Sequence, residues 1–259
     1  MSAKLLTAID GPVLTATIND PPARNAITRE FYELFKACLD GPASDPAVRA
    51  MVLTGAEGFF CAGGNVHGLK ERTEQNYEGR RGSVDKLHEM IEAMRAFPKP
   101  IIAAVEGGAA GAGASLALAC DLIVAAKEAY VSVAYVKIGL TPDGGATHFL
   151  GRALPRHLVT EMVWTGDRIG MERLHVLGVV NRLTESGAAL AEAQSWAAQL
   201  ATGPQAAMAK GKALIHAAPL TSMSEQLAAE ADGIATALGG VEAREGIDAF
   251  LEKRRPDWS

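Results

Sequence analysis

Short apolar runs of the kind that form buried strands recur along this chain. Residues 101–105 are an uninterrupted apolar run, which is typical of a strand covered on both faces. Residues 5–10 and 13–19 are apolar, threonine-containing runs on either side of Gly11-Pro12, and this arrangement predicts a hairpin. Further short strands are expected at residues 50–54, 122–125 and 130–133.

Helical periodicity appears between these runs and dominates the C-terminal part of the chain. Thr28 is placed to cap a first helix, and residues 84–97 have the apolar spacing of another. Residues 66–82 are polar, charged and weakly periodic, so we expect a mobile surface segment there, of the kind that can close over a ligand. Further helices are expected at residues 188–200, 205–216, 222–237 and 241–254. Their apolar faces have little else in the chain to cover them, which favours an oligomer.

The stretch at residues 99–121, KPIIAAVEGGAAGAGASLALACD, predicts a strand, a tight turn and a helix over residues 114–120. Gly107, Gly108, Gly111 and Gly113 let the backbone turn sharply and expose amides at the start of the helix. Such amides stabilise negative charge, either a phosphate or a developing oxyanion. A dinucleotide fingerprint would open the first βαβ unit, and the chain has no Gly-Lys-Ser/Thr loop, so an oxyanion site is favoured. The alternative is that these glycines serve only close helix–strand packing.

Composition narrows the classes of function. The chain has 259 residues, of which 48% are hydrophobic, and this predicts one large globular domain. The net charge is -5, and acidic and basic residues are mixed along the chain without a basic cluster large enough for nucleic acid or a membrane surface. Neither is therefore expected as a partner. Cys38, Cys61 and Cys120 are widely spaced and odd in number, which favours reduced thiols in the cytoplasm. His67 and His88 lack the spacing of a metal site, so no metal is expected.

An isolated acid, Asp143, lies in the small and apolar turn at residues 138–147. One interpretation is that its side chain caps the helix that follows. The other is that it transfers protons, with a pKa raised by an apolar pocket. Trp164 is expected in the core. The basic cluster at residues 250–255 is either a solvated helix end or a contact for a phosphate-bearing ligand.

Five short motifs are distributed along nearly the whole chain. They are NDPPARNAI at residues 19–27, FCAGGNV at 60–66, the stretch 99–121, the turn 138–145 and FLEKR at 250–254. Together they resemble the enoyl-CoA hydratase/isomerase, or crotonase, superfamily. The resemblance implies an α/β fold in which ββα units form a spiral over residues 1–186. It also implies a helical region, residues 187–259, that builds homotrimers or dimers of trimers. The implied substrate is an acyl-CoA thioester, and coenzyme A enters only as part of it, with no separate cofactor.

The resemblance also assigns roles to individual residues. The backbone amides of Gly64 and Ala112 would hold negative charge on the thioester oxygen, and Ala112 stands where the family usually has glycine. Backbone groups of two loops would bind coenzyme A, and a neighbouring subunit would add two side chains. The loop residues are Arg24, Asn25, Ala26, Ala62, Asn65 and Val66, and the neighbour's residues would be Phe250 and Lys253.

Departures from the family pattern bear on the reaction. Hydratases of this family carry glutamates at the positions of Ser115 and Tyr135, and both carboxylates are needed to orient and activate water. Asp143 falls where some relatives have a catalytic aspartate. We therefore expect an isomerase in which Asp143 moves a proton along the acyl chain. Two alternatives stay open, an enoyl-CoA hydratase that uses Asp143 and a catalytically idle acyl-CoA-binding subunit. A dehalogenase is less favoured, because the aromatic residues and the histidine base that it needs are not recognisable.

Overall fold

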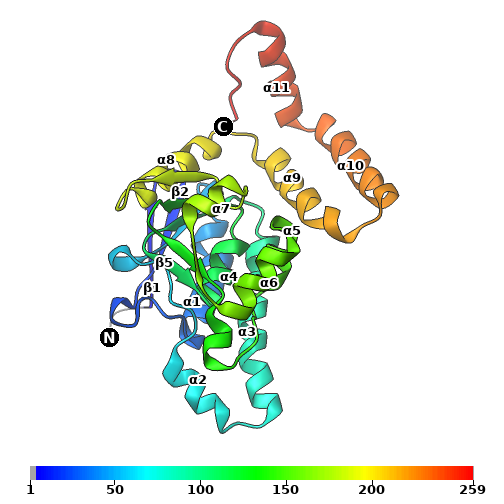
Figure 1. Cartoon of the computed structure of the whole chain (residues 1–259). Helices are drawn as coiled ribbons and strands as arrows, with labels where there is room; N and C mark the ends of the chain where they lie inside the picture. The colour runs from blue at the N-terminus through cyan, green and yellow to red at the C-terminus, as the bar shows by residue number, and fades with distance from the viewer. Residues whose placement is uncertain (1–3, 259) are drawn as a thin grey trace.

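The computed structural model describes residues 4–258 and is built on a six-stranded sheet (Figure 1). The strands lie in the order β1-β2-β3-β4-β6-β9, and every neighbouring pair is parallel except the β1–β2 hairpin. Their bounds are β1 Leu5–Asp10, β2 Val13–Ile18, β3 Ala50–Gly55, β4 Ile101–Val105, β6 Leu122–Ala126 and β9 Arg182–Thr184. The hairpin and the buried strands expected from the sequence are confirmed.

A second, smaller sheet has the order β5-β7-β8. Its strands are β5 Gly108–Ala110, β7 Tyr130–Ser132 and β8 Arg168–Gly170. A strand of the large sheet, a strand of the small sheet and a helix follow one another twice, as β4, β5, α4 and as β6, β7, α5. Nearer the N-terminus the isolated bridges Ile27–Gly64 and Cys61–Ala109 take the place of short strands. The chain therefore winds as the expected spiral of ββα units.

Helices cover both faces of the large sheet (Figure 1). Around the sheets lie α1 Arg29–Asp40, α2 Val66–Thr73, α3 Tyr77–Ala96, α4 Ala112–Ala119, α5 Ala146–Ala153, α6 Arg156–Thr165, α7 Met171–Val176 and α8 Ala189–Ala201. They are followed by α9 Gln205–Ala217, α10 Met223–Leu238 and α11 Val241–Glu252. No helix of the described residues is long and apolar enough to cross a membrane.

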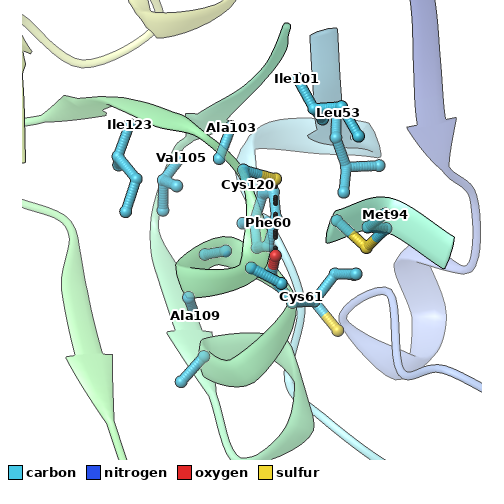
Figure 2. Packing of buried hydrophobic residues seen from close by; sticks show 14 of the residues in the cluster. Leu53, Phe60, Cys61, Met94, Ile101, Ala103, Val105, Ala109, Cys120 and Ile123 are labelled. Carbon is cyan, nitrogen blue, oxygen red and sulfur yellow. Dashed lines mark hydrogen bonds between the residues drawn. The ribbon is translucent and has the colours of Figure 1, made fainter. Parts of the chain in front are cut away.

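Strand β4 lies in the middle of the core, which is why its apolar run is uninterrupted. Ile101, Ala103 and Val105 point to the face covered by α1, α3 and α4, where Figure 2 shows Ile101 beside Leu53 and Val105 on the side of Ile123. Ile102 and Ala104 point to the opposite face, which α8 covers. The helix presents small side chains there at every fourth position, Ala189, Ala193, Ala197 and Ala201, and these let it lie close to the sheet.

Residues 66–82 lie at the surface as expected and are helical, whereas the mobility of the segment stays a prediction. The segment forms α2 and the first turn of α3. Each helix begins at an asparagine, since Asn65 accepts a hydrogen bond from the Gly68 amide at 3.2 Å and Asn76 accepts one from the Gly79 amide at 2.9 Å. Most side chains of the segment are exposed, so apolar periodicity is weak and the caps carry the local signal.

Trp164 is not a core residue, contrary to expectation. Its side chain is 76% exposed near the end of α6. The helix buries Leu158 and Met162, and a residue two positions after Met162 points away from the buried side of the helix. Helical geometry therefore overrides the general tendency of tryptophan to be buried.

Helices α9, α10 and α11 project from the two sheets as a C-terminal arm (Figure 1). Lys212 of α9 ties the arm to the core, because its Nζ donates to Asp121 Oδ2 at 2.8 Å and to the carbonyls of Met94 and Lys99 at 3.3 Å. The same Asp121 oxygen accepts the Ile101 amide at 2.8 Å. Helix α8 lies beyond the predicted boundary at residue 186 but packs on the sheet, and the division into two regions stays a prediction.

Replacing Lys212 by methionine is expected to lower the free energy of unfolding by about 2 kcal/mol, because a mostly buried carboxylate loses its cation. Urea denaturation at fixed protein concentration measures this loss. The matched control is Lys36→Met, since Lys36 and Asp40 form an exposed pair within one helix whose loss should cost less than about 0.5 kcal/mol. Equal losses in the two variants would contradict an anchoring role for Lys212.

Candidate active site

The first glycine-containing loop, residues 60–66, and the second, residues 107–113, touch each other through their backbones. Cys61 of the first loop pairs with Ala109 in a parallel bridge, and its carbonyl accepts the Ala110 amide at 2.9 Å. A Cβ on Gly113 would lie 2.4 Å from the Cys61 carbonyl oxygen, and one on Gly63 would lie 2.7 Å from the Ala110 oxygen. Gly63 also has a φ of +95°. These two positions require glycine because any side chain would force the loops apart.

The contact between the loops brings two unpaired amides together. Gly64 is held between two bonds of a bridge, in which the Ile27 amide donates to Gly63 O at 2.8 Å and the Asn65 amide donates to Ile27 O at 3.2 Å. Ala112 is the first residue of α4. Neither the Gly64 nor the Ala112 amide donates to an acceptor within residues 4–258. A Cβ on Gly63 would lie 3.2 Å from the Ala112 nitrogen. Gly64 follows Gly63 directly, so Gly64 and Ala112 are near neighbours.

Asp143 lies against the first turn of the same helix. Ser115 of α4 donates from Oγ to the Asp143 carbonyl oxygen at 2.8 Å. A Cβ on Gly144 would lie 2.9 Å from Ser115 Cβ, so the turn that carries Asp143 packs closely on α4. The Asp143 carboxylate accepts a hydrogen bond at Oδ1 from Tyr135 Oη at 2.7 Å. A carboxylate and two free amides therefore converge on the start of α4.

The capping interpretation of Asp143 is wrong. Helix α5 begins after Gly145, and no side chain caps its first turn. Asp143 contributes only its backbone there, since the Ala146 amide donates to the Asp143 carbonyl at 3.2 Å. The carboxylate makes no hydrogen bond to the helix and accepts one from Tyr135 instead.

The pKa of Asp143 is raised above the ordinary value of an aspartate. Burial is the main cause, because it disfavours the charged form. The hydrogen bond from Tyr135 and the positive fields of His88 and Arg72 oppose this effect. A carboxylate with a raised pKa is a stronger base, which suits it to remove a proton from carbon.

The tyrosine hydroxyls near Asp143 remain protonated at neutral pH. Burial raises the pKa of Tyr32 to about 12; Arg72 opposes the rise and the charge of Asp143 adds to it. Burial and the neighbouring Asp143 carboxylate raise the pKa of Tyr135 well above its usual range. Tyr135 therefore acts as a hydrogen-bond donor to the Asp143 carboxylate, and its hydroxyl does not serve as a base.

Sequence reasoning missed two polar neighbours of Asp143. His88 of α3 accepts the Gly144 amide at Nε2, at 3.4 Å. Arg72 of α2 lies near both Asp143 and the hydroxyl of Tyr32. The sequence gives no direct signal for these contacts, because the helices that carry them are brought to Asp143 only by tertiary packing.

The loop residues predicted to contact coenzyme A lie together, beside Gly64. The Ala62 amide donates to Arg24 O at 2.9 Å. Asn25 is fully buried and binds backbone with its side chain, which accepts from the Asp20 amide at 2.9 Å and donates to Ala56 O at 2.8 Å. Its amide also donates to Asp20 O at 2.8 Å, so Asn25 shapes the loop from within. Arg24 is exposed and its guanidinium lies 5.8 Å from the centre of the Phe59 ring.

Phe250 and Lys253 do not join these loops within one chain. Both lie at the end of α11, the outermost part of the C-terminal arm in Figure 1. The Phe250 side chain is 82% exposed. Their predicted contact with coenzyme A therefore requires a second subunit.

Comparison with known proteins places this geometry in a family. The family model for enoyl-CoA hydratase/isomerase matches residues 8–259. The 1,2-epoxyphenylacetyl-CoA isomerase of Escherichia coli is 32% identical over 256 residues, which cover 98% of each chain. The 2,3-dehydroadipyl-CoA hydratase of the same organism is 32% identical over 257 residues, covering 99% of this chain and 98% of the relative.

Solved structures agree with the sequence relatives. The crystal structure of an enoyl-CoA hydratase from Polaromonas sp. JS666 has a TM-score of 0.95 at 42% sequence identity, and the match covers 98% of each chain. A putative enoyl-CoA hydratase from Streptomyces coelicolor A3(2) has a TM-score of 0.94 at 32% identity, covering 99% of this chain and 94% of the other. The chain therefore belongs to the enoyl-CoA hydratase/isomerase, or crotonase, superfamily.

Proposed function

We propose that the protein is an acyl-CoA isomerase of the double-bond or epoxide type, in which Asp143 carries a proton along the acyl chain. In a 3-enoyl-CoA, the carboxylate removes a proton from C2, and the electron pair delocalises onto the thioester oxygen as an enolate. The protonated carboxyl then returns the proton to C4, and the double bond moves into conjugation. The Gly64 and Ala112 amides donate hydrogen bonds to the enolate oxygen. The observation that carries this proposal is one half-buried carboxylate beside two unpaired amides.

The number of carboxylates favours isomerisation over hydration. Activating water and protonating the adjacent carbon are two tasks, and hydratases of the family divide them between two glutamates. Ser115 and Tyr135 stand at those positions, and both hydroxyls are engaged with Asp143. The relatives at 32% identity include an isomerase and a hydratase, so the names of the relatives do not decide between the reactions. Hydration by Asp143 alone is the second candidate.

A panel of acyl-CoA thioesters tests the proposal. The purified full chain is expected to convert 3-enoyl-CoA or epoxide-type substrates and to hydrate crotonyl-CoA much more slowly. Absorbance of the conjugated thioester and mass spectrometry of the product distinguish the reactions, because hydration adds the mass of water. Hydration of crotonyl-CoA at an ordinary enzymatic rate would favour the hydratase. Tight thioester binding without turnover of any acyl chain would favour an idle binding subunit.

We also propose that the protein works as a trimer or a dimer of trimers. The C-terminal arm exposes many large apolar side chains, and exposed apolar surface of this kind favours association. They are Ile215, Leu220, Met223, Leu227, Ile234, Leu238, Val241, Ile247, Phe250 and Leu251. A neighbouring subunit would also bring Phe250 and Lys253 to coenzyme A. The cysteines Cys38, Cys61 and Cys120 are free and buried, which supports a reducing compartment such as the cytoplasm.

A further inference from the structure

The Asp143 carboxylate is held by one oxygen only. Tyr135 Oη donates to Oδ1 at 2.7 Å, and Oδ2 accepts no hydrogen bond from residues 4–258. A hydrogen bond of this length to a carboxylate is short and directional, so it fixes the rotation of the side chain as well as its charge. The two oxygens of Asp143 therefore have different environments, and Oδ2 is the one available to a substrate.

Ser115 fixes the backbone of the same residue. Its Oγ donates to the Asp143 carbonyl oxygen at 2.8 Å and lies 3.4 Å from Tyr135 Oη. Ser115 is fully buried on α4, and Tyr135 is buried in the short helix η4, Ala134–Ile138. Two hydroxyls from separate elements thus hold the carbonyl and the carboxylate of one residue, and they contact each other.

We propose that Tyr135 and Ser115 are positioning residues, which hold Asp143 so that Oδ2 alone removes the proton and returns it. This inference rests on the proposed isomerase function and adds to it a role for the two residues that replace carboxylates. Tyr135 stabilises the ionised carboxylate that starts the reaction, and Ser115 keeps the turn at the distance that the substrate carbons require. Neither residue exchanges a proton with the substrate.

Several charged or titratable groups face the Asp143 carboxylate and set its protonation together. His88 lies on α3, Arg72 on α2, Tyr32 on α1 and Tyr135 on η4. Burial raises the pKa of Asp143, and Tyr135, His88 and Arg72 oppose the rise in that order of importance. Tyr135 is the group whose hydrogen bond to the carboxylate has a defined geometry, so its removal should have the largest single effect.

Tyr135→Phe tests the inference because it deletes the hydroxyl and keeps the ring. Loss of a hydrogen bond to a charged group is expected to raise the pKa of Asp143 by about 1 to 2 units. The acid limb of the pH profile of kcat should move up by the same amount. At pH values above that limb, kcat should fall about 10- to 100-fold through misplacement of the base, with KM nearly unchanged. Ser115→Ala should lower kcat with a smaller shift of the acid limb.

Tyr130→Phe is the matched control, since Tyr130 lies in β7 of the second sheet, where its ring packs against Phe59 and Arg168 and makes no contact with Asp143. It should change neither the pH profile nor kcat. A Tyr135→Phe profile that does not move, or moves to lower pH, would overturn the positioning role.

Direct titration separates this inference from the proposed reaction. Carbon-13 NMR of aspartate carboxyls follows the ionisation of Asp143 without any substrate, and Asp143→Asn identifies its resonance. The pKa in Tyr135→Phe should exceed that of the wild-type chain even if no isomerisation is detected. An unchanged NMR pKa in a folded Tyr135→Phe protein contradicts the inference. A fully active Asp143→Asn variant contradicts the proposed function instead.

Discussion

Replacing Asp143 by asparagine is expected to lower kcat for isomerisation by about 10²- to 10⁴-fold, the range typical of losing a general acid–base group. Asparagine has nearly the same shape and can still accept the hydrogen bond from Tyr135, so the pocket should keep its form. The variant cannot take a proton from C2, however. Because Gly64, Ala112 and the coenzyme A loops are untouched, KM and the affinity for a thioester analogue should change little. Steady-state kinetics and calorimetric binding measure the two quantities.

Asp40→Asn provides a matched control for this experiment. Asp40 lies at the end of α1, is exposed and pairs with Lys36, so its replacement makes the same chemical change away from the site. Its kcat should equal that of the wild-type chain within about twofold, as for surface substitutions in general. Unchanged turnover in Asp143→Asn would remove Asp143 from the mechanism and with it the proposed isomerase.

The same substitution should make the protein more stable at neutral pH. Burial raises the pKa of Asp143 in the folded chain, so the folded state disfavours the ionised form. The resulting cost is present above the folded pKa, decreases as the pH falls through it, and vanishes below the pKa of an unfolded aspartate, about 3.9. Asparagine carries no such cost. The free energy of unfolding of Asp143→Asn should therefore exceed that of the wild type near neutral pH and converge with it in acid.

The strands and loops near the site could be predicted because their signals are local. The apolar run of β4 and the glycines at residues 107–113 indicate a strand and a turn from neighbouring residues alone. Thr28 caps α1, as expected from its place before the helix. Gly63 and Gly113 stand where backbones touch, so glycine was itself the signal. The resemblance to the superfamily then connected the two loops, which periodicity alone could not do.

The environment of Asp143 could not be predicted in the same way. Ser115 and Asp143 are 28 residues apart, and His88 and Gly144 are 56 residues apart. No local rule relates such positions, and a lone histidine on an amphipathic helix gives no sign of its partner. From the sequence, Tyr135 was noted only because it stands where hydratases have a glutamate. The structure shows that its hydroxyl donates a hydrogen bond to Asp143. Helix α2 was missed although its signal is local. None of its residues is buried, so its signal lay in the Asn65 cap rather than in apolar spacing.

Ala112→Pro is expected to lower kcat by about 10²- to 10³-fold, the cost of losing one oxyanion donor. Proline has no N–H and carries Cδ on its nitrogen instead, so it removes the proposed donor and fills the space to which the N–H pointed. The substitution suits this position because Ala112 is the first residue of α4, where proline is well tolerated and no intrahelical bond is lost. Gly111 before it has φ 52° and ψ -128°, a conformation that glycine adopts without strain.

Ala112→Gly is the matched control, since it changes the side chain and keeps the amide. It should retain kcat within about threefold, because a single glycine at the start of a helix costs little stability and leaves the donor in place. Thermal unfolding of both variants shows whether α4 still forms. If Ala112→Pro is folded, binds the thioester and keeps the wild-type kcat, the enolate does not depend on this amide. If Ala112→Gly loses activity as much as Ala112→Pro, the side chain matters and the amide assignment fails.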